Sequence, residues 1–329
     1  LWNSLRISRQ IIREFKPHVV AGVGGYASGP ILRAAAKARI PIVFQEQNSY
    51  AGVTNRILAG KAEKIFVAFE GMEKYFPAGK IMFTGNPVRQ DIVNSETTRE
   101  EALRFYNLDP EKKTVLVIGG SLGSGTINTS LLKGFRQFDS STQIIWQTGR
   151  YYYERVKEEF SKSANNRVHI VPFIRNMELA YAAADVIISR AGAGTISELA
   201  IVGKPVILVP SPNVAEDHQT KNALALVEMN AAIHIPDEGA KALLLKEARS
   251  LIDDPGRAQI FLKTEWEALP KTQNEFLIEP VSIDKSIVRI NLFPAKLAGI
   301  DIDKLWAALY RSATTIKGSL EQFEVVLDG

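Results

Sequence analysis

The chain has 329 residues, of which 46% are hydrophobic and 23% are charged, a balance typical of a globular protein with room for two domains. It contains no cysteine, which excludes disulfides, thiolate metal sites and a cysteine nucleophile. The net charge of +4 is mild and permits attraction to an anionic surface, while no membrane-spanning run, signal peptide or nucleic-acid-binding pattern is visible.

Residues 1–90 form the first predicted domain, in which helices alternate with short strands. Residues 1–16 predict an amphipathic helix, because hydrophobic side chains recur every three or four positions, and Pro17 ends it. A second helix is predicted at residues 31–38, and β-branched runs predict strands at residues 18–21, 41–45, 64–68 and 80–84. We place the domain boundary near residue 90, after the turn Gly85–Arg89.

Two glycine-rich turns, Gly22–Pro30 and Gly119–Gly125, each follow a β-branched run and precede a predicted helix. Such a turn points backbone N–H groups and the positive end of the helix toward one spot, which suits a phosphate or another oxygen-rich ligand. Two such turns in successive αβ blocks predict two domains of the nucleotide-binding type.

The first turn also allows a different interpretation. Gly22, Gly24 and Ala27 have the spacing of a dinucleotide-binding turn, and Glu46 lies about where the ribose-binding acid would be. Pro30 argues against this interpretation, because it falls in the first turn of the following helix. The alternative function is that of a nicotinamide-dependent oxidoreductase.

Residues 91–260 form the second predicted domain. Strands are predicted at residues 114–118, 143–147, 168–172, 185–189, 205–209 and 231–235. Helices are predicted at residues 126–138, 151–160, 177–184, 195–202, 219–229 and 240–252. This alternation predicts an α/β fold with a parallel, doubly wound sheet that binds ligands at the carboxyl ends of its strands.

Small residues follow the predicted strand at residues 185–189, and they lead to Glu198. A carboxylate near the start of that helix can accept hydrogen bonds from two vicinal hydroxyls, as on a ribose. The same residues also fit a capping box, with Thr195 as the N-cap and Glu198 as its partner. Both interpretations stay open.

A polar loop follows the predicted strand at residues 205–209 and ends at another helix start. His218, Gln219 and Asn222 lie at that start and would reach a bound sugar. Asp217 precedes them, and it is interpreted as the cap of the helix.

Residues 261–329 break the pattern and predict an α+β tail without an assigned role. Strands are predicted at residues 275–278, 286–293 and 322–327, and a helix is predicted at residues 303–312. The triplet Asp301–Asp303 precedes that helix and is interpreted as its cap. His18, His169 and His234 lie in or beside β runs and are interpreted as structural, so no metal site is expected.

Several separated segments resemble the MurG family of glycosyltransferases, and the resemblance covers residues 1–254. The segments are Gly22–Pro30, Glu46–Asn55, Gly85–Arg89, Gly119–Gly123, Arg190–Glu198 and Asp217–Ala223. The resemblance implies a GT-B fold of two Rossmann-like domains and no cofactor. It also implies inverting transfer of N-acetylglucosamine from UDP-N-acetylglucosamine to undecaprenyl-diphosphoryl-N-acetylmuramoyl-pentapeptide in peptidoglycan synthesis.

The resemblance also implies roles for single residues. Those implied for donor binding are Asn48, Arg89, Ser121, Ile174, Glu198, His218 and Gln219. Ile174 would meet the uracil through its backbone, Glu198 would hold the ribose, and Gln219 and Asn48 would lie nearest the sugar. The loop implied for the donor diphosphate contains Gly119, Gly120 and Gly123, and the loop implied for the acceptor side contains Gly24, Gly25 and Tyr26.

Two features differ from the family. Its opening glycine-rich loop, which ends in a histidine proposed to be catalytic, has no match here, so the first domain is expected to be incomplete and the catalytic residue stays unassigned. We therefore expect the chain as given to bind UDP-N-acetylglucosamine but to transfer the sugar poorly, with a catalytically silent nucleotide-sugar binding protein as the alternative. Residues 261–329 have no match either.

The resemblance gives the helix at residues 1–16 a second interpretation. Trp2 and Leu5 beside Arg6 and Arg9 would rest on an anionic membrane surface. The other interpretation is a helix packed on the sheet of its own domain. The expected location is the cytoplasmic face of the bacterial inner membrane, as a peripheral protein that binds no nucleic acid.

Overall fold

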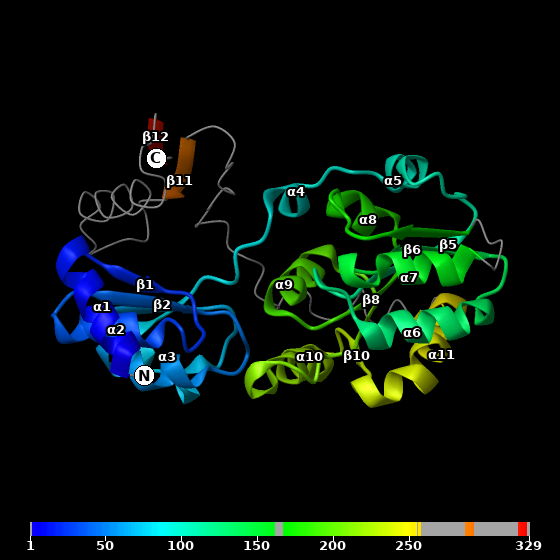
Figure 1. Ribbon diagram of the computed structural model, residues 1–329. Coiled ribbons are helices and arrows are strands. Elements are labelled where there is room, and N and C mark those ends of the chain that lie inside the picture. The colour runs from blue at the N-terminus through cyan, green and yellow to red at the C-terminus, as the bar shows by residue number, and fades with distance from the viewer. Residues whose placement is uncertain (1, 162–166, 255, 258–286, 293–321, 328–329) are drawn as a thin grey trace. The chain divides into compact units, whose positions relative to one another are not determined.

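The computed structural model describes residues 2–161, 167–254, 256–257, 287–292 and 322–327. The chain forms two compact units, which are called unit 1 and unit 2 here and are seen in Figure 1. Of the described residues, unit 1 holds those up to Arg89 together with residues 287–292 and 322–327. Unit 2 holds those from Gln90 to Arg257.

Unit 1 is built on a parallel sheet with the strand order β1-β2-β3-β4. The strands are Val20–Gly22, Ile42–Glu46, Lys64–Val67 and Ile81–Phe83. Each lies within one or two residues of a strand that the β-branched runs predict. Because every strand runs in the same direction, the loops that follow β1, β2, β3 and β4 share one edge of the sheet.

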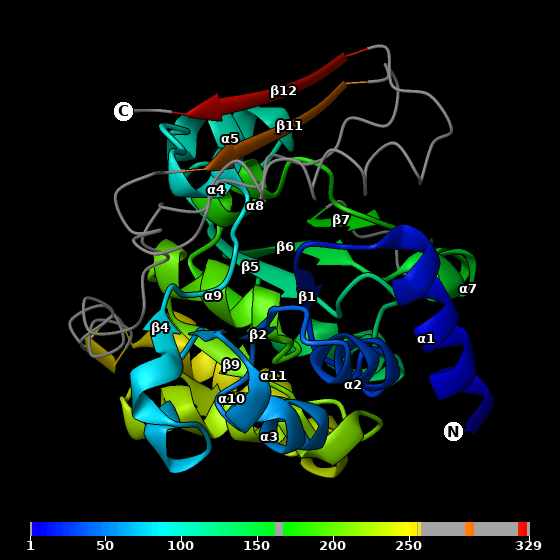
Figure 2. The same ribbon diagram turned by 90° about the vertical axis from the view of Figure 1, so that its left-hand side faces the viewer.

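Helices α1 (Trp2–Phe15), α2 (Gly29–Lys37) and α3 (Val53–Leu58) belong to the same unit. Helix α1 packs along α2, as Figure 2 shows. Ile12 of α1, Leu32 of α2 and Phe44 of β2 share one hydrophobic core. Helix α3 has only six residues, and no pattern in the sequence predicts it.

Unit 2 is built on six parallel strands in the order β10-β9-β8-β5-β6-β7. They are Lys113–Ile118, Thr142–Gln147, Val168–Val171, Val186–Ser189, Val206–Leu208 and Ile233–His234, numbered β5 to β10 along the chain. The strand order reverses between β5 and β8, because the first three strands add on one side and the last three on the other. This order is that of a doubly wound nucleotide-binding sheet, and the reversal is its topological switch point.

Helices cover both faces of this sheet (Figure 1). One group consists of α6 (Gly125–Gly134), α7 (Arg150–Ser161) and α11 (Ala240–Asp253), which pack on one another around a shared core. The other group contains α4 (Gln90–Val93), α5 (Arg99–Phe105), α8 (Met177–Ala183), α9 (Ala193–Val202) and α10 (His218–Glu228). The predicted α/β class and the doubly wound sheet are therefore confirmed.

Two parallel strands are described in the tail, β11 (Ile287–Leu292) and β12 (Gln322–Leu327). Both coincide with strands that the sequence predicts. The predicted strand at residues 275–278, the predicted helix at 303–312 and the triplet Asp301–Asp303 lie outside the described residues. Within the part of the chain that the structure describes, no helix has the length and hydropathy needed to cross a bilayer.

Candidate functional site

The carboxyl edge of the unit 2 sheet aligns the ends of four strands. Ile118 at the end of β5 is in register with Gln147 of β6 on one side and with Ser189 of β8 on the other, and Ser189 is in register with Leu208 of β9. The loops after β5 and β8 therefore lie next to each other at the switch point. Open α/β sheets bind their ligands at this position.

The glycine turn after β5 and the loop after β6 together leave no room for side chains at three positions. A Cβ on Gly119 would lie 2.6 Å from the amide nitrogen of Ser124. Gly123 has a φ of +82°, and a Cβ there would collide with the carbonyl of Thr148. Gly149 has a φ of +81° and packs against the backbone of Gly123 in the same way. Glycine is thus required at these positions for conformation and for space.

The same turn begins α6 and presents the backbone N–H groups of its first turn. Ser124 is the N-cap, and its hydroxyl accepts a hydrogen bond from the amide of Ile127 at 3.2 Å. Ser121 is exposed in the turn, and Gly120, with a φ of +79°, has open space around its Cα. A helix N-terminus beside an exposed glycine turn favours an anionic ligand.

Gln147 links two loops of this edge, and the sequence analysis did not single it out. Its Nε2 donates to the carbonyl of Gly120 at 3.1 Å, and its Oε1 accepts from the amide of Ile174 at 2.8 Å. The N–H group of Ile174 is thereby engaged, so a ligand would meet this residue through its carbonyl oxygen. A polar residue directly after the apolar run Ile144–Trp146, at the carboxyl end of the strand, was the available signal.

The helix after β8 begins earlier than the sequence predicts. Helix α9 starts at Ala193, with Gly192 as its N-cap, so the capping box on Thr195 and Glu198 is wrong. Glu198 lies in the second turn, where its Oε2 accepts a hydrogen bond from the hydroxyl of Tyr181 at 2.9 Å. The carboxylate is held by a side chain of α8 and does not serve as the predicted cap.

A charged cluster fastens the loops on both sides of the switch point. Arg190 follows β8, and its Nη1 donates to the carbonyls of Val209 at 2.9 Å and Pro210 at 2.7 Å and pairs with Asp237 at 2.5 Å. The second oxygen of Asp237 accepts from the hydroxyl of Thr126, in the first turn of α6, at 2.7 Å. Asp237 therefore connects the loop after β8 with the helix that follows the glycine turn.

The start of α10 completes this edge. Glu216 and Asp217 have φ values of +55° and +53°, a conformation that is uncommon for residues other than glycine. Asp217 occupies the N-cap position of α10, as predicted, but its side chain makes no capping hydrogen bond. His218 is the first residue of α10, and the Oε1 of Gln219 accepts from the amides of Ala191 at 3.2 Å and Ser211 at 2.9 Å.

These two bonds fix the orientation of the Gln219 amide. Because Oε1 receives both backbone N–H groups, the NH2 group of Gln219 is directed to act as a donor. Asn222, one turn further along α10, is buried and donates to the carbonyl of Ala191 at 3.4 Å. Asn222 thus supports the loop after β8, whereas the sequence analysis expects it to reach a sugar.

The carboxyl edge of the unit 1 sheet carries the other predicted residues. Gly24 and Gly25 have φ values of +88° and +73°, and Tyr26 beside them is 84% exposed. Gln47, after β2, donates to the carbonyl of Val23 at 2.7 Å and so connects this turn with the next loop. Arg89 is the last residue of this part of unit 1.

Glu46 organises the loop that contains Asn48. Its Oε1 accepts from the backbone amide and the side-chain Nδ2 of Asn48, both at 3.2 Å. Its Oε2 accepts from the amide of Gly52 at 2.9 Å and from Nδ2 of Asn55 at 2.8 Å. Glu46 is only 2% exposed, so it does not present a carboxylate to a ribose. The dinucleotide-binding interpretation therefore lacks the ribose-binding acid that it requires.

Two histidines of unit 2 have an environment that favours the neutral ring. Burial lowers the pKa of His169, which packs edge to face on Tyr106 with ring centroids 5.2 Å apart. Burial also lowers the pKa of His234, at the end of β10. Among the described residues, no group of three or more His, Asp or Glu side chains is arranged to hold a metal ion.

Known proteins match this chain over most of its length. Residues 1–67 match the glycosyltransferase family 28 N-terminal domain, and residues 114–265 match the family 28 C-terminal domain. Relatives of this chain include proteins named UDP-N-acetylglucosamine–N-acetylmuramyl-(pentapeptide) pyrophosphoryl-undecaprenol N-acetylglucosamine transferase. The protein of Parabacteroides distasonis is 57% identical over 258 residues, which are 78% of this chain and 70% of the relative. That of Phocaeicola vulgatus is 54% identical over 257 residues, which are 78% of this chain and 68% of the relative.

A solved structure agrees with these matches. The crystal structure of Acinetobacter baumannii MurG superimposes with a TM-score of 0.64 at 30% identity, covering 78% of this chain and 71% of that one. The two parallel-sheet units, together with these family matches, place the chain in the class of glycosyltransferases with the GT-B fold. Within this class, the chain belongs to glycosyltransferase family 28 and to its MurG family.

Proposed function

We propose that this chain catalyses the inverting transfer of N-acetylglucosamine from UDP-N-acetylglucosamine to undecaprenyl-diphosphoryl-N-acetylmuramoyl-pentapeptide. This reaction converts lipid I to lipid II in peptidoglycan synthesis. The observation that carries the proposal is the 57% identity to a transferase named for this donor and this acceptor. The loops at the switch point of unit 2 support it, because they offer an anion site and a held carboxylate on one sheet edge.

We assign donor recognition to unit 2. The amides of the turn Gly119–Gly125, together with Ser121, bind the diphosphate, and Glu198 accepts hydrogen bonds from the ribose hydroxyls. The carbonyl oxygen of Ile174 accepts from the N3–H group of uracil, since its own N–H donates to Gln147. Gln219 donates to an oxygen of the sugar, and His218 stands beside it at the start of α10.

In unit 1 we assign Asn48 and Arg89 to donor recognition and the turn with Gly24, Gly25 and Tyr26 to the acceptor diphosphate. The two glycines place backbone amides in the turn, and their positive φ values shape it. Asn48 is held in place by Glu46 through two hydrogen bonds. A preorganised loop of this kind loses little conformational entropy when a ligand binds.

The chemistry follows from the charge that develops on the leaving group. As the bond between C1 of the sugar and the diphosphate oxygen breaks, UDP gains negative charge, and the amides at the start of α6 stabilise it without reorganising. Inversion requires the C4 hydroxyl of the acceptor to attack from the opposite face while a base takes its proton.

A transfer assay tests this proposal directly. Purified chain is incubated with radiolabelled UDP-N-acetylglucosamine and lipid I in detergent. Movement of label to the lipid would demonstrate the reaction and would overturn the expectation of poor transfer. Titration calorimetry with UDP-N-acetylglucosamine and with NAD is run on the same folded sample, and only the first is expected to give heat. No heat with UDP-N-acetylglucosamine would refute the donor assignment, whereas heat without transfer would identify a silent nucleotide-sugar binding protein.

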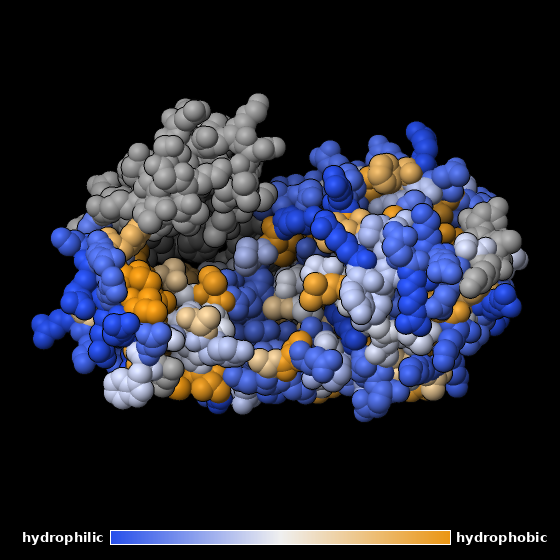
Figure 3. Space-filling model, viewed as in Figure 1, coloured by the Kyte–Doolittle hydropathy of each residue, from blue (hydrophilic) through white to orange (hydrophobic). Residues whose placement is uncertain are grey.

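We further propose that α1 attaches the protein to an anionic membrane surface. Trp2, Arg6, Arg9 and Arg13 follow one another at spacings of three or four, so they form one stripe, and Trp2 is 83% exposed. A neighbouring side of the helix packs inward through Ile12. Figure 3 shows hydrophilic and hydrophobic residues side by side on the unit that contains α1. A basic and aromatic helix face of this kind binds anionic lipid.

Vesicle sedimentation tests this attachment. We expect vesicles of phosphatidylglycerol and phosphatidylcholine to retain the protein at low salt and to release it as ionic strength rises. The triple variant Arg6→Gln, Arg9→Gln, Arg13→Gln should lose most of this retention. A matched variant that removes three exposed lysines of unit 2, at positions 133, 241 and 246, should keep it. Equal loss in both variants would contradict a specific role of α1.

A further inference from the structure

The Glu198 carboxylate is held by Tyr181, a residue that lies outside the loops assigned to the ligand. The hydroxyl of Tyr181 donates to its Oε2 at 2.9 Å, and the tyrosine side chain is only 3% exposed. Tyr181 is on α8 and Glu198 is on α9, so this bond joins two helices that follow different strands. A hydrogen bond to an ionised carboxylate is stronger than one between neutral groups, so it selects one orientation of a flexible side chain.

The backbone around Tyr181 is itself fixed. Nζ of Lys204 donates to the carbonyls of Tyr181 at 2.7 Å, Ala182 at 2.9 Å and Ala184 at 2.5 Å. Nη1 of Arg99 donates to the carbonyl of Ala183 at 2.7 Å. Two cations thus satisfy four successive carbonyls at the C-terminal end of α8, where the helix dipole favours positive charge.

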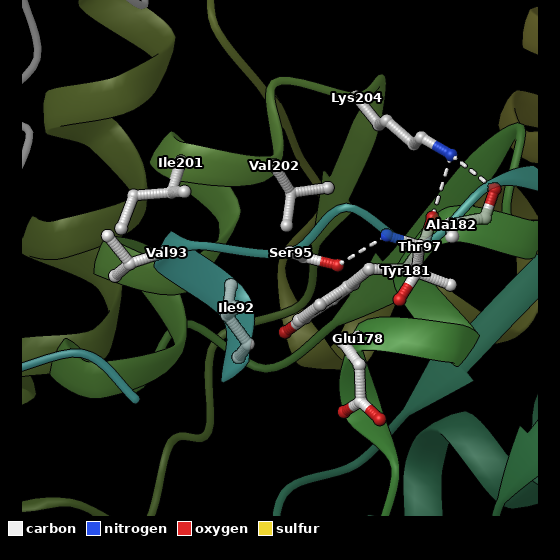
Figure 4. A pocket seen from close by; sticks show the side chains of 10 residues that line it. All are labelled: Ile92, Val93, Ser95, Thr97, Glu178, Tyr181, Ala182, Ile201, Val202 and Lys204. Carbon is white, nitrogen blue, oxygen red and sulfur yellow. Dashed lines mark hydrogen bonds between the residues drawn. The ribbon is translucent and has the colours of Figure 1, made fainter. Parts of the chain in front are cut away.

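A cavity of about 250 Å³ lies beside this arrangement and is lined by Ile92, Val93, Ser95, Thr97, Glu178, Tyr181, Ala182, Ile201, Val202 and Lys204. Figure 4 shows the ring of Tyr181 among these side chains and Lys204 bonded to the end of the helix. Tyr181 borders this cavity with only 3% of its surface exposed, and its hydroxyl donates to Glu198. The hydroxyl bond to Glu198 is therefore a specific constraint on both side chains.

We infer that Tyr181 is a positioning residue for the nucleotide, and that its hydroxyl orients the Glu198 carboxylate toward the ribose hydroxyls. This inference rests on the proposed function, which assigns the ribose to Glu198. An ionised carboxylate has about four lone-pair positions, so the bond from Tyr181 is compatible with further hydrogen bonds from the two ribose hydroxyls. The tyrosine orders the carboxylate before the ligand arrives, which removes part of the entropy cost of binding.

The test compares UDP with 2′,3′-dideoxy-UDP, which lacks both ribose hydroxyls, by titration calorimetry. We expect the unmodified protein to bind UDP at least about tenfold more tightly than the dideoxy nucleotide. In Tyr181→Phe we expect this ratio to fall to about threefold, with the loss confined to UDP. The matched control is Tyr106→Phe, because Tyr106 is a buried tyrosine of the same unit whose hydroxyl lies 3.5 Å from the carbonyl of Asn176.

The possible outcomes separate the inference from the function on which it rests. A reduced ratio in Tyr181→Phe with an unchanged ratio in Tyr106→Phe and a retained melting transition supports the positioning role. An unchanged ratio in Tyr181→Phe overturns it, while the ribose assignment of Glu198 stands if Glu198→Gln lowers the ratio. Equal affinity of the unmodified protein for both nucleotides removes the ribose assignment and the inference together, and transfer of the sugar is then measured separately.

Discussion

Two glycine turns that look alike in the sequence differ in how they are packed. The turn after β5 is closed, since Gly119 and Gly123 lie so near other backbone atoms that no Cβ fits. The turn after β1 is open, because a Cβ on Gly25 would meet no atom within 4 Å and Tyr26 is 84% exposed. Both turns place glycines at positive φ and both precede a helix.

The difference shows that a glycine pattern can serve two purposes. In the closed turn, glycine allows two loops to approach backbone to backbone, which fixes the amides that precede α6. In the open turn, Gly25 supplies only a backbone conformation, and the surface around Gly25 and Tyr26 stays accessible.

The largest expected effect comes from comparing one glycine-to-alanine substitution in each turn. Gly123→Ala and Gly25→Ala both place a side chain at positive φ, which costs about 1–2 kcal/mol. Only Gly123→Ala also collides with the carbonyl of Thr148. We expect it to weaken UDP binding by more than about 100-fold and to lower the melting temperature. Gly25→Ala should keep UDP affinity within about threefold, and an equal loss at both positions would contradict the comparison.

A smaller effect is expected from the charged cluster beside the closed turn. Asp237→Asn leaves Arg190 without its carboxylate, and the two side chains are only 19% and 12% exposed. We expect a loss of about 2 kcal/mol in the free energy of unfolding, below the roughly 3–5 kcal/mol of a fully buried pair. Urea unfolding measures it, and a matching loss of UDP affinity would show that the cluster supports the turn.

The control for this prediction is an exposed pair in the same unit. Asp253 pairs with Arg249 at 3.1 Å on α11, and both side chains are more than half exposed. Asp253→Asn should change the free energy of unfolding by less than about 1 kcal/mol, as is usual for surface pairs. A loss as large as that of Asp237→Asn would mean that the Asp237 cluster has no special role.

The smallest expected effect concerns the sugar. Gln219→Glu keeps an oxygen for the amides of Ala191 and Ser211 but removes the NH2 donor. We expect the affinity for UDP-N-acetylglucosamine to fall about tenfold further than that for UDP, as for one lost hydrogen bond. Both ligands carry the diphosphate, so its repulsion by the new carboxylate affects both affinities. The repulsion therefore largely cancels in the ratio of the two affinities, which calorimetry measures. An unchanged ratio would show that Gln219 does not donate to the sugar.

Much of the fold was predictable because strands and helices are local patterns. Hydrophobic runs predict every strand of both sheets within two residues, and the strand alternation predicts a parallel, doubly wound sheet. Helix starts were less certain. The sequence favours Thr195 as a cap, but α9 begins at Ala193, because Gly192 already adopts the extended conformation that an N-cap needs.

The supporting residues of the site were not predictable. Gln147, Tyr181 and Asp237 act through partners that are 27, 17 and 111 residues away in the chain. Their roles depend on which strand ends lie side by side and on which helices pack together. No local pattern carries that information, because a hydrogen bond between side chains of distant segments requires the tertiary arrangement.

The sequence by itself determined the α/β class, the two glycine turns and the family, because each depends on residue order and on short-range conformation. The tertiary structure decided which turn is closed and which is open, and it decided that Glu46 is a buried loop organiser while Glu198 is a held, partly accessible carboxylate. The physical reason is burial. A glutamate carboxylate that is surrounded by donors, like that of Glu46, fixes the conformation of a loop, whereas a carboxylate with one side toward solvent can bind a ligand.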